Sequence, residues 1–441
     1  MSDPRPRDVF IEASVWHGSL DRADAILAAH PEVGNSDIHT AAILGDDVGV
    51  RYFLALDGAS ATLKSGPLRW DALTHLCFSK YLRLDKARSD GFVRAATALL
   101  DAGANAKTGF FETDHQPMPE WDSALYGAAG VAHHAGLTRL LLERGADPND
   151  DEVPYHAPET RDNDALRVLV ESGRLTSDNL STMLLRKADW HDHDGITYLL
   201  EHGADPNRMT RWGYTALHQA LRRDNARRNI DALLDYGADP LLKSRLGSVS
   251  AASIAARRGR GDVLELFEQR GVRLEFSGVE ALVAACARND ATTVGAIAAR
   301  EPSLVREVLA EGGRLLAEFA GTANAEGVGH LLDLGVDVGA RYEGDGYFDI
   351  AKDSTALHVA AWKAWPNVVT LLIARGASVD VPDGQGRTPL ALAVKACVDS
   401  YWSDRRSPAS VEALIRAGAS TSSVSRPSGY REVDDLLRAQ R

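Results

Sequence analysis

Six side chains of this 441-residue chain are of the types that transfer protons or bind ligands, and they lie in three short stretches. A histidine beside a carboxylate can work as an acid–base pair, and a His-x-His sequence can bind a transition metal. The His-x-His sequence here lacks a third ligand at a fixed spacing, so we predict no metal site and no cofactor. An acid–base or polar ligand site and a purely structural role both stay open. The candidates are Asp122, Tyr155, His156, Glu159, His191 and His193.

The elements that would position these residues repeat along the chain. The phrase Gly-Ala-Asp-Pro-Asn stands at 145–149 and again at 203–207, each time shortly after a Leu-Leu pair, and an altered third copy stands at 233–240. Recurrence at a period of about 33 residues is typical of stacked-repeat architectures. Such a solenoid is usually a binding surface, so the repeat favours a protein that holds a partner.

The spacing within one repeat, residues 214–240, predicts two short helices. Thr215 is placed to cap the first helix, and the second helix carries Leu233 and Leu234 on its apolar stripe. We expect Gly237 to end the second helix in the left-handed conformation, after which Ala-Asp-Pro turns the chain.

The starts of three first helices resemble the ankyrin repeat. Thr-Ala-Leu-His at 215–218 and at 355–358 resembles the Thr-Pro-Leu-His signature of that family, and Thr-Pro-Leu at 388–390 is similar to it. The resemblance implies a structural hydrogen-bonding role for His218 and His358.

The whole chain also resembles a group of bacterial ankyrin-repeat proteins. The likeness rests on Gly-Pro at 66–67 followed by Trp-x-x-Leu at 70–73, on the stretch 155–159, and on the Leu-Leu-x-x-Gly-Ala-Asp-Pro-Asn phrases. It implies a cytoplasmic bacterial protein and brings no biochemical activity with it.

The glycines that end the second helices count the repeats. Ten such glycines, together with two units that end at Pro31 and Pro302 instead, predict an all-α ankyrin-repeat solenoid of about twelve helix-turn-helix units, with insertions in units 3, 4 and 11, as a single domain over residues 1–441. Within it we distinguish an N-terminal unit (8–36), insertion-bearing units (65–122), an irregular short unit (153–178) and C-terminal units with a cap (387–441). The terminating glycines are Gly58, Gly103, Gly145, Gly173, Gly203, Gly237, Gly271, Gly335, Gly376 and Gly418.

The irregular short unit departs from the repeat where its first helix should lie. Pro158 would cost about 3 kcal/mol inside a helix, so we expect this helix to be broken or to form a single turn. Glu159 and Asp189 each stand 14 residues before the glycine of their unit. This spacing predicts that they are lateral neighbours, ~10 Å apart. Departures from a consistent pattern are where functional sites are expected.

Aromatic residues concentrate on the segments that precede the first helices. In an ankyrin stack these segments are the finger loops that line the concave face, and exposed aromatic side chains there are expected to be binding hot spots. The alternative is that each ring folds back to cover the small core of its own insertion. The predicted binding residues are Trp70, Phe111, Trp121, Trp212, Tyr347 and Phe348.

Composition limits the classes of protein. The net charge of −13 opposes nucleic-acid binding, which requires basic charge spread along one face. The sequence contains no run of ~18 apolar residues, the length that a membrane-spanning helix requires, and the first residues lack the apolar stretch of a secretion signal. The three cysteines lie in separate repeats and are expected to be buried, reduced thiols. We therefore expect a cytoplasmic monomer that binds neither nucleic acid nor membrane.

The sequence leaves two functions open. In the first, the chain binds a protein or peptide on its concave face through aromatic finger loops. In the second, it is an enzyme or small-molecule binder whose insertions close over a pocket near units 3–6 that contains the six polar candidates. An enclosed cavity on the order of several hundred Å³ with histidine or carboxylate groups of shifted pKa favours the second function, and an open aromatic groove favours the first.

Overall fold

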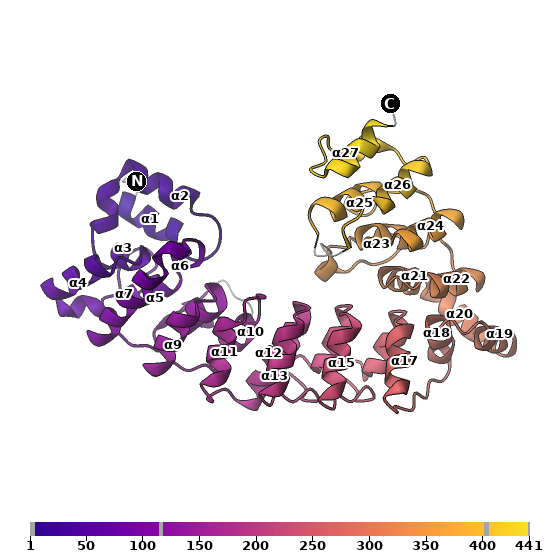
Figure 1. Cartoon of the computed structure of the whole chain (residues 1–441), viewed down its shortest axis with the longest axis horizontal. Coiled ribbons are helices and arrows are strands. Elements are labelled where there is room, and N and C mark those ends of the chain that lie inside the picture. The colour runs from indigo at the N-terminus through magenta and orange to yellow at the C-terminus, as the bar shows by residue number, and fades with distance from the viewer. Residues whose placement is uncertain (1–4, 114–117, 401–404, 440–441) are drawn as a thin grey trace. The chain divides into compact units, whose positions relative to one another are not determined.

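The computed structural model describes residues 5–113, 118–400 and 405–439. The chain divides into two compact parts, which we call unit 1 (residues 1–238) and unit 2 (residues 239–441). These two names are distinct from the numbers of the predicted repeats. Both units consist of short helices in successive pairs, drawn in indigo to magenta for unit 1 and in rose to yellow for unit 2 (Figure 1). The predicted insertion-bearing units (65–122) and C-terminal units (387–441) are each described only in part. The residues outside the described ranges are 1–4, 114–117, 401–404 and 440–441. The single domain over 1–441 stays a prediction.

Unit 1 contains helices and one antiparallel hairpin. The hairpin strands are β1 (Gly109–Glu112) and β2 (Glu120–Ser123). The helices are α1 (Pro6–Ser14), α2 (Asp21–Ala29), α3 (Ile38–Ile43), α4 (Asp47–Leu56), α5 (Ala72–Cys77), α6 (Lys80–Leu84), α7 (Ser89–Asp101), α8 (Ala124–Tyr126), α9 (Ala135–Glu143), α10 (Glu152–His156), α11 (Asp164–Glu171), α12 (Ser177–Asp189), α13 (His193–Glu201), α14 (Ala216–Arg222) and α15 (Arg227–Asp235).

Unit 2 is built from helices in the part of the chain that the structure describes, and its loops carry isolated β-bridges. The helices are α16 (Ala251–Arg257), α17 (Gly261–Gln269), α18 (Val279–Ala287), α19 (Ala291–Arg300), α20 (Pro302–Ala310), α21 (Gly312–Gly321), α22 (Ala325–Asp333), α23 (Ala356–Trp362), α24 (Pro366–Ala374), α25 (Pro389–Val398), α26 (Ala409–Arg416) and α27 (Arg431–Arg438). Within the described ranges, every helix of the chain is too short or too polar to cross a membrane.

The predicted capping residues cap the first helices of two repeats. Thr215 and His218 make a reciprocal capping box at the start of α14, with 2.7 Å between Thr215 Oγ1 and His218 Nδ1. Thr355 and His358 do the same at α23, at 2.9 Å. Each pair satisfies backbone N–H groups that a helix leaves without partners in its first turn. The structural role implied for both histidines is confirmed.

The terminating glycines behave as predicted with one exception. Gly237 has a φ of 83°, and the other predicted terminators from Gly103 onward also have positive φ, a conformation that costs glycine little. Gly58 does not, because α4 already ends at Leu56 and Asp57 starts a short 3-10 turn by accepting a hydrogen bond from Ala59 N. The assignment of Gly58 as a terminator is therefore wrong.

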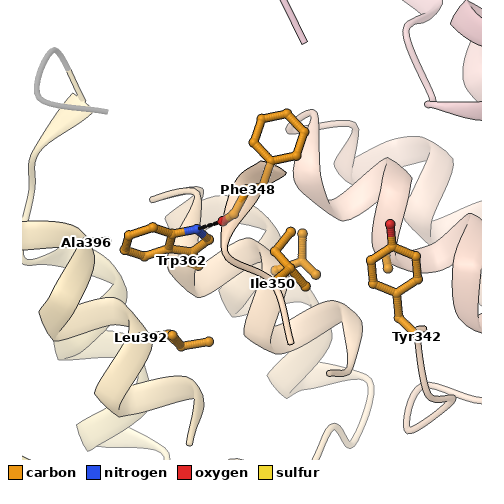
Figure 2. Close-up of a cluster of buried hydrophobic side chains, with 8 residues drawn as sticks. Tyr342, Phe348, Ile350, Trp362, Leu392 and Ala396 are labelled. Carbon is orange, nitrogen blue, oxygen red and sulfur yellow. Dashed lines mark hydrogen bonds between the residues drawn. The ribbon is translucent and has the colours of Figure 1, made fainter. Parts of the chain in front are cut away.

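A buried aromatic cluster occupies unit 2 beneath the loop that precedes α23. Figure 2 shows Phe348 and Ile350 of this loop beside Trp362 of α23, and Trp362 Nε1 donates a 2.5 Å hydrogen bond to the carbonyl of Phe348. Phe348 is 1% exposed. The loop thus folds back over its own core, and the expectation that Phe348 is exposed for binding is wrong. Tyr347 is partly buried against the same cluster.

The three cysteines are buried and free, as the sequence predicts. Burial raises the pKa of the Cys286 thiol to about 12 and that of Cys397 to about 11. A thiol with such a pKa stays protonated and unreactive at neutral pH.

Candidate functional site

A cavity of about 610 Å³ lies in unit 1, where the helix pairs are least regular. Its walls come from the segment after α1, from the hairpin, from α8 and α10, and from the loop before α14. Four aromatic rings, four carboxylates, one histidine and one arginine line it. These residues are Trp16, Tyr126, Tyr155, Trp212, Glu112, Glu120, Asp122, Glu152, His156 and Arg211.

The register of the hairpin determines which of its side chains reach the cavity. Phe110 pairs with Asp122 and Glu112 pairs with Glu120. Successive residues of a strand point to opposite faces, so these four share one face. Phe111 and Trp121 form the intervening pair on the other face, where their rings meet edge to face at 4.9 Å. The hairpin therefore presents three carboxylates to the cavity.

Aromatic rings pack beneath the cavity. Phe110 stacks on Trp70 at 4.1 Å, and Trp16 contacts Phe110 at 5.7 Å and Tyr126 at 6.1 Å. Trp16 has a φ of 71°, which is unusual for a bulky residue, and its N–H donates a 2.8 Å hydrogen bond to the carbonyl of Phe78. This left-handed turn brings the N-terminal segment against the hairpin and α8.

His156 is held between two carboxylates. α10 has only five residues and ends before Pro158, as the sequence predicts for the short unit. The His156 Nε2 atom lies 3.0 Å from Glu152 Oε2, and Nδ1 lies 2.9 Å from Glu159 Oε2. Burial alone would lower the pKa of His156, but the hydrogen bonds and negative charges of Glu152 and Glu159 outweigh it and raise the pKa to about 9. The same contact with His156 lowers the pKa of Glu159.

The carboxyl group of Asp122 has a pKa shifted toward neutral pH. Burial and, to a smaller extent, the charges of Glu152, Glu112 and Glu120 together raise its pKa to about 7, while His156 acts in the opposite sense. Its carboxyl group is therefore poised to gain or lose a proton near neutral pH, which is the property required of a general acid or base.

Two segments of the chain match known families of repeats. Residues 184–229 match the family described as "Ankyrin repeats (many copies)", and residues 352–384 match "Ankyrin repeat". The chain contains ankyrin repeats. The first segment runs from α12 to α15 and contributes Arg211 and Trp212 to the cavity wall, and the second holds α23 and the capping box of Thr355.

Two curated proteins are similar to parts of this ankyrin-repeat chain. Over 84 residues it is 42% identical to Serine/threonine-protein kinase 12 of Arabidopsis thaliana, covering 19% of this chain and 17% of the kinase. Over 290 residues it is 23% identical to human Transient receptor potential cation channel subfamily A member 1, covering 58% of this chain and 24% of the channel. The chain thus spans about a quarter or less of each relative.

Of the six polar candidates, three line the cavity: Asp122, Tyr155 and His156. Glu159 lies directly behind His156. His191 and His193, within the ankyrin match at 184–229, do not line the cavity, and His193 Nδ1 is 3.2 Å from Asn229 Oδ1. The junction that carries these two histidines is therefore not part of the cavity wall.

The predicted neighbourhood of Glu159 and Asp189 is confirmed. The guanidinium group of Arg186 bonds to both carboxylates and bridges the short unit to the next repeat. Asp189 also accepts hydrogen bonds from Arg223 Nε at 2.7 Å and from Gln219 Nε2 at 2.6 Å. In the part of the chain that the structure describes, no group of three or more histidine, cysteine or acidic side chains is placed to hold a metal ion.

The aromatic candidates separate into three environments. Trp212 lines the cavity with its ring 5.4 Å from that of Tyr155. Phe111, 62% exposed, and Trp121 lie on the outer face of the hairpin. Trp70 is only 7% exposed and packs among Phe110, Phe78 and His75, so the expectation that it is exposed on a finger loop is wrong.

Six lining residues escaped the sequence analysis. Three of them could have been found: the alternation Phe-Phe-Glu before the turn and Glu-Trp-Asp after it places Glu112 and Glu120 on the face of Asp122, and Glu152 precedes His156 by one helical turn. The others, from the segment after α1, from α8 and from the loop before α14, had no pattern in the sequence that indicates a cavity. The six are Trp16, Glu112, Glu120, Tyr126, Glu152 and Arg211.

Proposed function

We propose that this chain is a protein-binding ankyrin-repeat protein that holds a peptide segment of its partner at the cavity of unit 1. The observation that carries the proposal is that the cavity is open to the surface and walled by aromatic rings, and is not closed over by the described residues of the insertions. The cavity has a volume of about 610 Å³, which falls within the roughly 300–1,000 Å³ of ligand pockets. It opens where the short α10 and the hairpin interrupt the regular helix pairs.

The lining has the composition of a recognition site. Tryptophan, tyrosine and arginine dominate the energetics of protein interfaces, and Trp212, Tyr155 and Arg211 all line the cavity. Phe111, exposed on the other face of the hairpin and packed against Trp121, extends the apolar surface available to a partner beyond the cavity.

A second candidate function is an enzyme or small-molecule binder that uses the same cavity. The observation that favours it is the pair of titratable groups with displaced pKa values, about 7 for Asp122 and about 9 for His156. Two such groups in one cavity could divide the roles of base and acid between them.

Selection of peptides on the full chain distinguishes these functions. A library of random twelve-residue peptides displayed on phage should yield an enriched sequence family. The variant Trp212→Ala should weaken binding of the enriched peptide by about 2 kcal/mol, because it removes an aromatic wall of the cavity. The matched variant Trp190→Ala removes a tryptophan that is 39% exposed and does not line the cavity, and binding should be unchanged.

The absence of any enriched peptide would contradict the peptide proposal and favour the second candidate. Equal losses in the two tryptophan variants would move the peptide site away from the cavity. A bacterial, cytoplasmic setting, a monomeric state and the lack of nucleic-acid and membrane partners remain our predictions, as does the absence of a cofactor.

A further inference from the structure

We propose that the cavity of unit 1 binds an organic cation, an alkylammonium or guanidinium group, between its aromatic rings and the carboxylate of Asp122. This inference rests on the proposed function, because it names the chemistry of the ligand group that enters the same cavity. Three independent features of the lining support it.

The first feature is the balance of charge. Four carboxyl groups line the cavity, against the cations His156 and Arg211. Both cations already have carboxylate partners: His156 contacts Glu152 and Glu159, and an Arg211 guanidinium nitrogen lies 3.2 Å from Asp151. Neither Glu159 nor Asp151 belongs to the lining, so the field inside the cavity is negative and attracts a cation.

The second feature is the carboxyl group of Asp122. Asp122 is only 3% exposed, and among the described residues its side chain makes no hydrogen bond or ion pair. Burying a carboxylate without a partner is costly, and such groups are normally paired or hydrogen-bonded. The structural framework of the hairpin does not use this carboxyl group, since β1 and β2 pair through their backbones. A cation in the cavity would supply the missing partner.

The third feature is the ring content of the walls. Cations are attracted to the faces of tryptophan and tyrosine rings within about 6 Å of the ring centre. Trp16 and Tyr126 form one such wall, with their rings perpendicular and 6.1 Å apart, and Trp212 and Tyr155 form another, 5.4 Å apart. The chain already places its own guanidinium groups on two of these rings, Arg186 on Tyr155 at 4.0 Å and Arg211 on Trp212 at 4.7 Å.

Other ligand chemistries fit less well. An anion would meet the carboxylates of Glu112, Glu120 and Asp122, which all face the cavity from one side of the hairpin. A neutral apolar group would satisfy the rings but leave Asp122 buried without a partner. A cation with an aliphatic stem satisfies both the rings and the carboxylate.

The test is a titration of the full chain with small cations, followed by tryptophan fluorescence. The probes are Nα-acetyl-lysine amide, Nα-acetyl-arginine amide and butylammonium, with Nα-acetyl-norleucine amide as the neutral isostere of lysine. At least one cation should bind about tenfold more tightly than the norleucine derivative. Tighter binding of the capped amino acids than of butylammonium would identify a peptide side chain as the source of the cation, and equal binding would identify a free organic cation.

Variants assign the binding to the cavity. Asp122→Asn should weaken cation binding about tenfold, and Glu120→Gln, a second variant on the same face, should weaken it in the same direction. Asp90→Asn removes the same formal charge at an exposed position outside the cavity and should have no effect. Circular dichroism confirms that each variant is folded.

Two outcomes would overturn the inference. The first is equal affinity for the lysine and norleucine derivatives, including no binding of either at about 20 mM. The second is an equal effect of Asp122→Asn and Asp90→Asn on cation binding. These outcomes are separable from failure of the proposed function. Enriched peptides that lack lysine and arginine would contradict only the cation inference. Cation binding without any enriched peptide would contradict only the peptide proposal.

Discussion

Replacement of His156 by glutamine should remove a stabilising charge interaction that depends on pH. Glutamine keeps a polar side chain of similar length but cannot carry the positive charge between Glu152 and Glu159. The pKa of His156 rises from 6.5 to about 9 in the folded chain. At ~1.4 kcal/mol per pH unit this displacement corresponds to roughly 3 kcal/mol, and coupling to the two glutamates makes about 2–3 kcal/mol a reasonable expectation.

The sign of the effect follows from the raised pKa. A group whose pKa is higher in the folded state binds its proton more tightly there, so its stabilising contribution is complete below pH 6.5. That contribution is lost as the pH rises through about 9. The free energy of unfolding of His156→Gln should therefore lie about 2–3 kcal/mol below that of the parent chain at pH 6, and the difference should shrink toward zero near pH 10.

Urea unfolding of the full chain at pH 6, 8 and 10, followed by tryptophan fluorescence, measures this difference. The control is His30→Gln, which removes an exposed histidine that is also beside a glutamate, 3.3 Å from Glu32. Exposed pairs of this kind contribute about 0–1 kcal/mol, so His30→Gln should change little at any pH. A difference for His156→Gln that stays constant from pH 6 to 10 would refute the charge argument, as would an NMR titration that places the pKa of His156 near 6.5.

Two further changes test other parts of the structure. Asp122→Asn should raise the melting temperature at pH 8 but not at pH 3.5. The pKa of Asp122 is raised from 3.8 to about 7, so the stability associated with its neutral form is lost as the pH rises through about 7. Asparagine stays neutral at every pH, so the variant avoids this loss. A lower melting temperature of the variant at pH 8 would contradict this reasoning. Leu233→Ala, at a fully buried position of α15, should lower the free energy of unfolding by roughly 2–5 kcal/mol. Leu56→Ala, at a side chain that is 67% exposed, should lower it little. Equal losses of stability in urea unfolding would contradict the assignment of the buried stripe.

The features that the sequence predicts best depend on neighbours within one turn of helix. Thr215 caps α14 together with His218, three residues later, and Gly237 ends α15 because its left-handed backbone needs no support from elsewhere. The end of α10 before Pro158 follows from the chemistry of proline alone. Gly58 shows the limit of such reasoning, since Asp57 can cap a following turn and then no left-handed glycine is required.

The features that the sequence predicts poorly depend on long-range packing. A tryptophan on a loop can face solvent or cover a core, and nothing near Trp70 decides between these outcomes. Its burial depends on Phe110, which stacks on it, and on Trp16, which packs against Phe110 from a segment almost a hundred residues away. The same long-range packing brings Trp16 into the cavity wall. Polar candidates are predicted better where they are close in sequence, as His156 and Glu159 lie three residues apart.

The place of the cavity follows from how a repeat stack distributes its stability. Each repeat contacts only its neighbours, so a unit that lacks a regular first helix must be held by the adjoining repeats. The ion-pair series from His156 through Glu159 and Arg186 to Asp189 supplies that support, and Arg223 joins it to α14. With the short unit held in this way, the volume that a regular helix would fill stays open. Asp122 and its acidic neighbours can then remain in the wall of the cavity. Their burial lowers the stability of the chain, and the repeat fold does not require it. A cationic ligand in the cavity would offset this loss of stability.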